Sequence, residues 1–447
     1  MKKNILVIIL SIFSLSRLHA QTDKHVVLIS IDGLRPEFYQ ADKWASPVLK
    51  QMAANGVSSN GVRGVFPSVT YPSHTTLITG VMPAVHGIYY NSPFEPKGQT
   101  GRWYWDSKLI KTQTLWDAAN KAGLTTASVF WPVSLNAPVS YNVPEIWSLD
   151  KSVDRLAPIR ENAKPAGLFE EIELNATGKL NASDLNSDFL SADENGSRMV
   201  AYLIKKHKPH LTTFHIYSVD HASHVQGRDG ELVRKAVAGA DHAIGNILEA
   251  IEQAGIKDKT TIIVTGDHGF ADIHTSVSPN VMLLQNGIIA DTTAKANWKA
   301  KFHTSGASAF LHLKDKGDMK TVNQVKKLLA GMSWEQKKLF RVVERNELDE
   351  IGADPNVLLA LAPVEGISMN STVKGTVLKP VTGGTHGFFP DFKNIQTGFV
   401  SIGPGLVKAG IISEMGLEDI APFISEILNL NMADLKVGLK NEVFNQK

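Results

Sequence analysis

The sequence predicts an α/β fold: a central, mostly parallel sheet flanked by helices, with a smaller inserted lobe. Three observations support this fold class. Apolar, β-branched runs of strand length recur along the chain, helical patterns lie between them, and an Asp follows several of the runs. Strands of this composition, alternating with helices, are typical of a sheet that is covered on both faces.

Three segments carry the clearest strand signal, namely 26–31, 211–219 and 260–265. Each is rich in Val, Ile or Thr, which favour strands. In open α/β sheets, ligands bind beyond the carboxyl ends of the strands. An acidic residue follows each of the three segments, so we expect three carboxylates to converge at one edge of the sheet: Asp32, Asp220 and Asp267.

The remaining elements follow from local patterns. A late strand and turn are expected at 398–405, a surface excursion at 150–183, and a smaller lobe at 275–380. These lie within one catalytic domain that covers residues 21–447. Helical periodicity predicts helices at 41–54, 114–122, 184–207, 231–254 and 417–428.

The first twenty residues have the layout of a secretory signal peptide. Two lysines precede the apolar run 5–13, and polar residues lead to Ala20, after which we expect cleavage. The run is too short to span a bilayer, and no other segment is predicted to be a membrane helix. The sequence contains no Cys, so disulfides are excluded. A periplasmic or secreted protein is therefore expected.

Charge argues against a polyanionic partner. The formal net charge is +2, and the leader contributes Lys2, Lys3 and Arg17 but no acid, so its removal leaves −1. Such a balance supplies no basic field for a nucleic-acid polymer or an anionic membrane. A small-molecule substrate is expected, and the sequence leaves the oligomeric state open.

Five short motifs carry the chemistry. Asp220 and His224 are four residues apart, which places both on one face of a helical turn. Asp267 and His268 stand at a strand end, and His386 follows two glycines. With Asp32 these side chains provide three carboxylates and three imidazoles, which suit two zinc ions. The fifth motif, 66–74, places the Thr70 hydroxyl where a helix is expected to begin.

Together, the motifs resemble those of the nucleotide pyrophosphatase/phosphodiesterase family within the alkaline phosphatase superfamily. The resemblance runs from about His25 to about Leu428 and implies an alkaline-phosphatase-like fold. It implies that Thr70 is the nucleophile and forms a phospho-threonine intermediate. It also implies two zinc sites, one made by Asp220, His224 and His386 and the other by Asp32, Asp267, His268 and the Thr70 oxygen.

The resemblance also suggests how substrate is held. Asn91 matches a family asparagine that binds a phosphoryl oxygen, helped by the Thr70 backbone amide, and Tyr71 matches an aromatic that stacks on a nucleobase. The chain departs from the family at His215 and Tyr217, where a Tyr and a Glu are usual. This departure affects the second wall of a base pocket and leaves the metal ligands intact.

The expected reaction is hydrolysis of phosphodiester or pyrophosphate bonds. Related phosphomonoesterases carry a Lys-x-Arg pair, whereas the corresponding segment 127–136 contains no basic residue. Two alternatives on the same fold remain, a phosphomonoesterase and a phospholipid-headgroup phosphodiesterase. A third is a non-catalytic binding protein, which the complete set of ligand residues disfavours.

Each motif also has a purely structural interpretation. Asp32 before Gly could be a turn residue, Thr70 an N-cap, and His386 an ordinary loop histidine. Asn91 alone is more simply a turn asparagine, and Tyr71 a core residue. The remaining histidines near the motifs, His74, His86 and His221, are expected to pack or to act indirectly.

Overall fold

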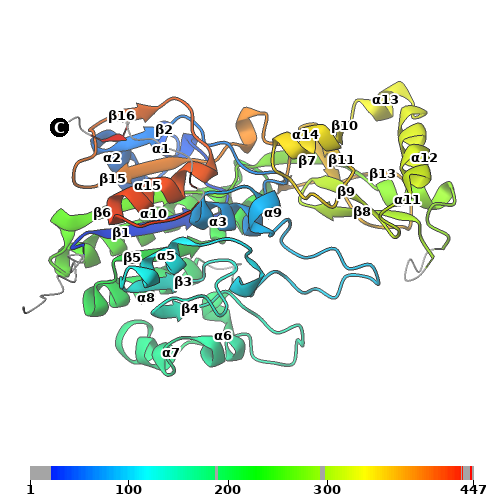
Figure 1. The fold of residues 1–447 in the computed structure, drawn as a ribbon. Coiled ribbons are helices and arrows are strands. Elements are labelled where there is room, and N and C mark those ends of the chain that lie inside the picture. Colours follow the sequence, from blue (N-terminus) through cyan, green and yellow to red (C-terminus); the bar gives the residue numbers. More distant parts are fainter. Residues whose placement is uncertain (1–21, 187–189, 292–296, 434, 436–442, 445–447) are drawn as a thin grey trace, which may run out of the picture.

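The structure, a computed structural model, describes residues 22–186, 190–291, 297–433, 435 and 443–444. The predicted leader, 1–20, lies outside these residues. Figure 1 shows a large sheet with helices on both faces and a second group of strands and helices at one end. This architecture confirms the predicted α/β fold class.

The central sheet has eight strands, and five of its seven neighbouring pairs are parallel. The two antiparallel pairs both involve β15. In spatial order the strands are β16 (Gly410–Ile412), β2 (Val57–Ser59), β15 (Phe399–Ile402), β6 (Thr260–Thr265), β1 (His25–Ile31), β5 (Leu211–Ile216), β3 (Thr126–Val129) and β4 (Tyr141–Val143).

Strand β1 lies inside the sheet because both of its faces are apolar. Val27 and Ile29 belong to one hydrophobic cluster, while Val26 and Leu28 belong to a cluster on the opposite face. Alternate side chains of a strand point to opposite faces, so helices must cover the sheet on both sides. The parallel neighbours β5 and β6 bring three carboxyl ends together beside β1.

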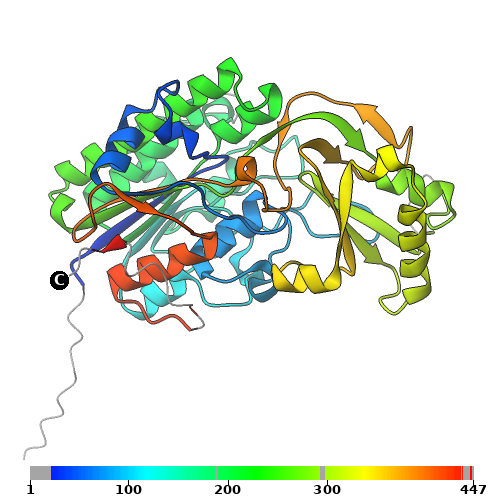
Figure 2. The ribbon, with the colours of Figure 1, turned by 90° about the horizontal axis from the view of Figure 1, so that it is seen from above.

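Two layers of helices cover these faces (Figure 2). On one face lie α1 (Glu37–Gln40), α2 (Pro47–Asn55), α6 (Ala157–Asn162), α7 (Leu168–Ile172), α8 (Ser191–His207), α9 (Ser218–Gln226) and α10 (Glu231–Gln253). On the other lie α3 (Thr70–Thr79), α5 (Leu115–Lys121) and α15 (Ile420–Leu428), and the short α4 (Pro83–His86) contacts α3.

Two of the sequence predictions need correction. The strand expected at 211–219 ends at Ile216, and α9 begins at Ser218, so Asp220 lies in the first turn of a helix. Asp193 accepts a hydrogen bond from the Tyr217 N–H at 3.3 Å, and a carboxylate at this position favours a helix start.

The segment 150–183 is more than a surface excursion. It forms α6 and α7, and Phe169 and Ile172 are fully buried in the cluster beneath the central sheet. The prolines and charges of the segment obscured the helical pattern of α7, whose apolar side chains pack into the core.

A second body fills much of 275–380. One antiparallel sheet has the order β10 (Phe340–Glu344), β11 (Leu359–Pro363), β9 (Ser308–Leu313) and β8 (Ala300–Ser305). Strand β7 (Ala271–Val277) pairs with β12 (Gly366–Met369), β13 (Leu378–Pro380) and β14 (Gly384–Thr385). The helices here are α11 (Pro279–Gln285), α12 (Met319–Ala330), α13 (Trp334–Lys337) and α14 (Arg345–Glu350).

This lobe has its own hydrophobic core, to which Val277, Phe302 and Leu361 contribute. That residues 275–380 form a distinct lobe within the catalytic domain remains a prediction. Among the helices that the structure describes, none has both the length and the apolar character needed to cross a membrane.

Candidate active site

The candidate site forms where β1, β5 and β6 end side by side. The Asp32 N–H donates to the Ile216 carbonyl at 2.7 Å, which ties the end of β1 to that of β5. The Gly33 N–H donates to Asp267 Oδ1 at 3.1 Å, which ties the same turn to the end of β6. Gly33 has a φ of +75°, a conformation that glycine adopts without strain.

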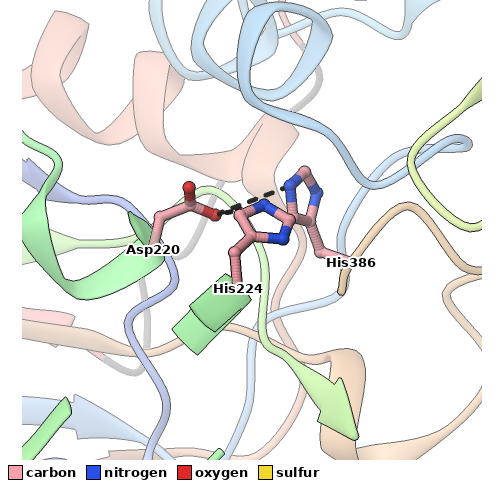
Figure 3. Close-up of side chains that lie close together, drawn as sticks. All are labelled: Asp220, His224 and His386. Atoms are coloured by element: carbon pink, nitrogen blue, oxygen red, sulfur yellow. Dashed lines mark ion pairs between the residues drawn. The ribbon is translucent and has the colours of Figure 1, made fainter. Parts of the chain in front are cut away.

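One group of candidate metal ligands contains Asp220, His224 and His386 (Figure 3). Asp220 Oδ1 lies 3.4 Å from His224 Nε2 and 3.5 Å from His386 Nε2. The first two residues are one turn apart on α9. His386 arrives from the distant end of the chain because β14, which precedes it, pairs with β7.

A second group lies directly beside the first. His268 Nε2 is 3.2 Å from Asp32 Oδ1 and 3.1 Å from Asp267 Oδ2. Ligand atoms of Asp32, Asp220 and His268 lie within 4.8 Å of one another. The rings of His268 and His386 stack at 3.6 Å, so the two groups form one continuous cluster.

Backbone carbonyls fix the orientation of all three imidazoles. The Nδ1 atoms of His224, His268 and His386 lie 3.1, 3.1 and 3.0 Å from the carbonyl oxygens of Gly384, Gly269 and Ser68 respectively. Since a carbonyl can only accept, each Nδ1 carries the proton, and the Nε2 of a neutral ring offers its lone pair to the cluster.

Burial makes this cluster electrostatically unfavourable without a cation. Burial, followed by the neighbouring His386, lowers the pKa of His268 well below its usual value, and burial lowers the pKa of His386 to about 4. Burial and the nearby Asp220 raise the pKa of Asp32, while burial and Asp32 raise that of Asp267. Neutral imidazoles therefore face crowded carboxyl groups.

Several of the facing atoms have no hydrogen-bond partner in the described part of the chain. They are Asp32 Oδ1, Asp220 Oδ1, Asp267 Oδ2 and His268 Nε2. Buried polar atoms are rarely left unpaired, and a carboxylate and imidazole donor set is one that divalent cations accept. The residues present therefore fit a metal centre.

Thr70 is the first residue of α3, and Val69 occupies the N-cap position. This corrects the interpretation of Thr70 as an N-cap residue. Its hydroxyl lies close enough to the Asp32 carboxyl to lower the pKa of that acid slightly, against the larger effects of burial and Asp220, which raise it. His74 packs beneath it, with Nδ1 2.8 Å from the Thr70 carbonyl oxygen, which confirms that this histidine lies near the site.

Asn91 reaches the same helix start. Its Oδ1 accepts the Tyr71 N–H at 2.9 Å, and its carbonyl accepts the Tyr104 N–H at 3.0 Å. With Oδ1 used in this way, the side-chain amide keeps its NH₂ group as a donor beside Thr70.

Tyr71 does not present a ring face to a ligand. Its side chain is 0% exposed, because every residue of α3 is buried, and it meets Trp103 edge to face at 5.1 Å. The expectation that Tyr71 stacks on a base is therefore wrong for this structure. Trp103, which covers Tyr71, is among the aromatic residues that line the cavity, whereas Tyr71 is not.

A cavity of about 230 Å³ opens beside the cluster. Apolar and aromatic side chains form most of its wall, and several polar groups interrupt them. It is lined by Asp32, Thr70, Trp103, Phe130, Glu145, Ile146, Trp147, Arg155, Ile159, Leu185, His215, Tyr217, Asp220 and His221.

Sequence reasoning did not identify several of these lining residues. His215 was noted only as a departure from the family, yet its Nε2 lies 3.2 Å from Asp32 Oδ2. The available signal was its place five residues before Asp220, near the end of a strand that leads into the site. Glu145, Trp147 and Arg155 come from loops whose sequence carries no comparable signal. His86, in contrast, is a buried packing residue, 3.0 Å from Thr76 Oγ1.

Comparison with known proteins gives this geometry a family context. A family model, type I phosphodiesterase/nucleotide pyrophosphatase, matches residues 26–388. The chain belongs to this family. The matched range extends from β1 to just beyond His386 and contains every residue of the metal cluster.

Curated relatives are longer and distant in sequence. Human ectonucleotide pyrophosphatase/phosphodiesterase family member 1 is 24% identical over 450 residues, which cover 94% of this chain and 42% of the relative. Venom phosphodiesterase of Naja atra is 22% identical over 441 residues, which cover 94% and 47%. The chain thus spans less than half the length of these relatives.

Solved structures share the fold. Murine ectonucleotide pyrophosphatase/phosphodiesterase 5 superposes with a TM-score of 0.69 and 19% identity, over 94% of this chain and 100% of that one. A related structure, an inactive Thr-to-Ala variant in complex with AMP, gives a TM-score of 0.68 over 94% and 98%. The alkaline-phosphatase-like fold expected from the sequence is confirmed.

Proposed function

We propose that the protein hydrolyses phosphodiester or pyrophosphate bonds of small, nucleotide-like substrates, with Thr70 as nucleophile beside two metal ions. One observation carries this proposal. Thr70 and Asp32 both line the cavity, and Asp32 belongs to a cluster of six side chains that could hold metal ions. Membership in a phosphodiesterase family supports the same reaction.

Two Zn²⁺ ions fit the donor set best. Asp220, His224 and His386 would hold one ion. Asp32, Asp267, His268 and the Thr70 oxygen would hold the other. Mixed nitrogen and oxygen ligands suit catalytic zinc, although such sites also accept other divalent metals. Such ions would supply Lewis acidity to the oxygens that enter and leave the phosphorus.

The residues of the chain perform two displacements. Thr70 Oγ attacks phosphorus and expels the leaving alcohol, which takes up the hydroxyl proton; the phospho-Thr70 that forms still carries the retained substituent as an ester. Water then attacks the same phosphorus, breaks its bond to Oγ, and restores the hydroxyl. The Asn91 NH₂ group and the Thr70 N–H at the start of α3 donate to the phosphoryl oxygens, whose negative charge they stabilise.

The lining favours a diester over a monoester. Arg155 is the single basic residue among those that line the cavity, apart from its histidines, and its side chain is exposed. A monoester carries an additional negative charge, for which this wall offers no buried cation. The phosphomonoesterase and phospholipid-headgroup alternatives on the same fold remain the rivals to test, together with a non-catalytic binding protein.

The test is a comparison of two model esters on purified, zinc-loaded protein. We expect a higher kcat/KM for bis-p-nitrophenyl phosphate than for p-nitrophenyl phosphate, and two zinc ions per chain by metal analysis. A monoester preference would favour the phosphatase rival. Failure to bind zinc, with neither ester hydrolysed, would favour the binding protein.

Export is part of the proposal. It rests on the leader of residues 1–20, which lie outside the described residues, with cleavage after Ala20. Determination of the N-terminus of the protein recovered from the periplasm or medium of its host tests it.

A further inference from the structure

The cavity contains a carboxyl group that the proposed reaction does not use. Glu145 lies in the loop after β4 and contributes to the cavity wall. Its Oε2 is buried and has no hydrogen-bond partner among the described residues. A buried carboxylate oxygen without a donor is costly, so the atom is suited to a donor that arrives with a ligand.

Neighbouring groups surround Glu145 without satisfying it. Burial raises its pKa to about 7, while His215, Tyr71 and Arg155 act in the opposite direction. Burial raises the pKa of Tyr71 well above its usual value, and the nearby Glu145 raises it further. Even so, neither Tyr71 Oη nor Glu145 Oε2 has a partner in hydrogen-bond geometry.

The walls beside Glu145 are flat and apolar. Trp103 and Trp147 meet edge to face at 5.1 Å, and Trp147 meets Trp105 at 5.0 Å, so the indoles brace one another. Ile146 and Phe130 add apolar surface to the same lining. Walls of this kind bind planar rings, and a few polar atoms then fix the ring's orientation.

The positive charge of Arg155 limits which hydrogen-bond donors of a ligand can pair with Glu145. Arg155 lines the same cavity and already acts on Glu145. A cationic ligand group would meet repulsion from this guanidinium, whereas a neutral N–H group would not. The lining therefore fits an uncharged ring nitrogen or amino group better than an ammonium group.

We propose that Glu145 is a specificity-determining residue that accepts a hydrogen bond from an N–H group on a planar heteroaromatic ring of the substrate. This inference rests on the proposed diesterase function. The ring belongs to the substituent that stays on phosphorus while the leaving group departs, and Glu145 takes no part in bond breaking. The preferred substrates are then diesters of nucleoside monophosphates whose bases carry a free N–H.

The test pairs substrates that differ only in this donor. The probes are p-nitrophenyl esters of adenosine and thymidine 5′-monophosphates, each compared with its N⁶,N⁶-dimethyl or N3-methyl analogue. For at least one base, we expect the N–H form to be preferred about 10- to 100-fold in kcat/KM, as a hydrogen bond to a charged group allows. Glu145→Leu should abolish this preference, while Glu145→Gln, which keeps an acceptor oxygen, should retain most of it.

Two control variants separate recognition from structure. Glu161→Leu alters an exposed Glu of α6 and should leave the N–H preference intact. Tyr71→Phe removes the hydroxyl beside Glu145. If Glu145 merely held Tyr71 and α3 in place, Tyr71→Phe and Glu145→Leu would lower kcat/KM equally for all esters, and the inference would be wrong.

Other outcomes are equally decisive. A preference for the N–H form that survives Glu145→Leu, or one that is absent for both bases, would overturn the inference. A Glu145-dependent preference for p-nitrophenylphosphocholine over the nucleotide esters would also overturn it, because the ligand group would then be a cation. Loss of the proposed function itself is distinguishable, since bis-p-nitrophenyl phosphate, which has no such donor, would also remain intact.

Discussion

Tyr90 connects the inserted lobe to the residue proposed to bind a phosphoryl oxygen, so its hydroxyl should matter for stability and for turnover. The side chain is 1% exposed, and its hydroxyl donates to Asp354 Oδ2 at 2.9 Å. Burial raises the pKa of Tyr90 well above its usual value, which keeps the hydroxyl protonated as a donor. Asn91 is the next residue along the chain.

Tyr90→Phe preserves the ring and removes one hydrogen bond to a carboxylate. Asp354 is 3% exposed, and its other oxygen accepts from the Asn356 N–H and Nδ2 at 2.8 and 2.9 Å. Asp354 Oδ2 would lose a donor that solvent cannot easily replace. We expect a loss of about 1.5–3 kcal/mol in the free energy of unfolding.

Tyr90→Phe should also change the steady-state kinetics, and kcat should change more than KM. If Asn91 donates to the phosphoryl group during the reaction, as proposed, a less firmly held Asn91 should lower kcat for bis-p-nitrophenyl phosphate more than it raises KM. The matched control is Tyr89→Phe. Tyr89 is only partly buried and its hydroxyl meets the exposed Lys111 at 3.4 Å, so this change should alter stability by less than about 0.5 kcal/mol.

Urea denaturation of the zinc-loaded variants and steady-state kinetics measure both effects. Equal stability for Tyr90→Phe and Tyr89→Phe, with unchanged kcat in both, would refute the reasoning. Lower stability of Tyr90→Phe with normal kcat would show that the link to the lobe supports folding and leaves Asn91 in place.

Three further predictions follow from the same structure. Removal of metal by a chelator should lower the melting temperature measured by scanning calorimetry, since unpaired carboxyl groups would then face one another; an unchanged melting temperature would contradict the metal centre. His386→Ala should reduce bound zinc from two ions to about one by metal analysis and lower kcat/KM on bis-p-nitrophenyl phosphate at least 100-fold; full zinc content would exclude it as a ligand. Glu173→Gln should destabilise the protein by about 1–3 kcal/mol near neutral pH, because hydrogen bonds from Arg160, the Leu180 N–H and Lys179 outweigh burial and lower the pKa of Glu173 to about 2. Its ionised form is favoured in the folded state, so the difference in stability should shrink as pH falls from about 4.3 towards 2; a difference that is constant over this range would contradict the assignment.

The sequence was most informative where a strand pattern and a charged residue coincide. Strands β1 and β6 occupy the predicted segments, with Asp32 and Asp267 just beyond their ends. Because β6 pairs with β1 in parallel, the carboxyl ends of both strands lie at the same edge of the sheet and bring these carboxylates together. The strand pattern alone was enough to predict this. The helical spacing of Asp220 and His224 was also readable, although the start of α9 was not, because it depends on Asp193 from another helix.

The cavity wall was much less predictable. Tyr71 follows the nucleophile in sequence, but whether its ring is buried depends on how α3 packs, which no local pattern encodes. Glu145 and Arg155 lie in irregular segments, and only the tertiary fold brings them to one cavity with Trp103. Residues whose role comes from distant contacts leave no periodic signal in the sequence.

The most direct test of the central claim is to trap the intermediate. Zinc-loaded protein is mixed with bis-p-nitrophenyl phosphate, quenched in acid within milliseconds, and digested for mass spectrometry. We predict a p-nitrophenylphosphoryl adduct on the peptide that contains Thr70, absent from Thr70→Ala, which should be inactive. Persistent hydrolysis by Thr70→Ala, with no adduct on this peptide in the unmodified protein, would contradict the proposed mechanism.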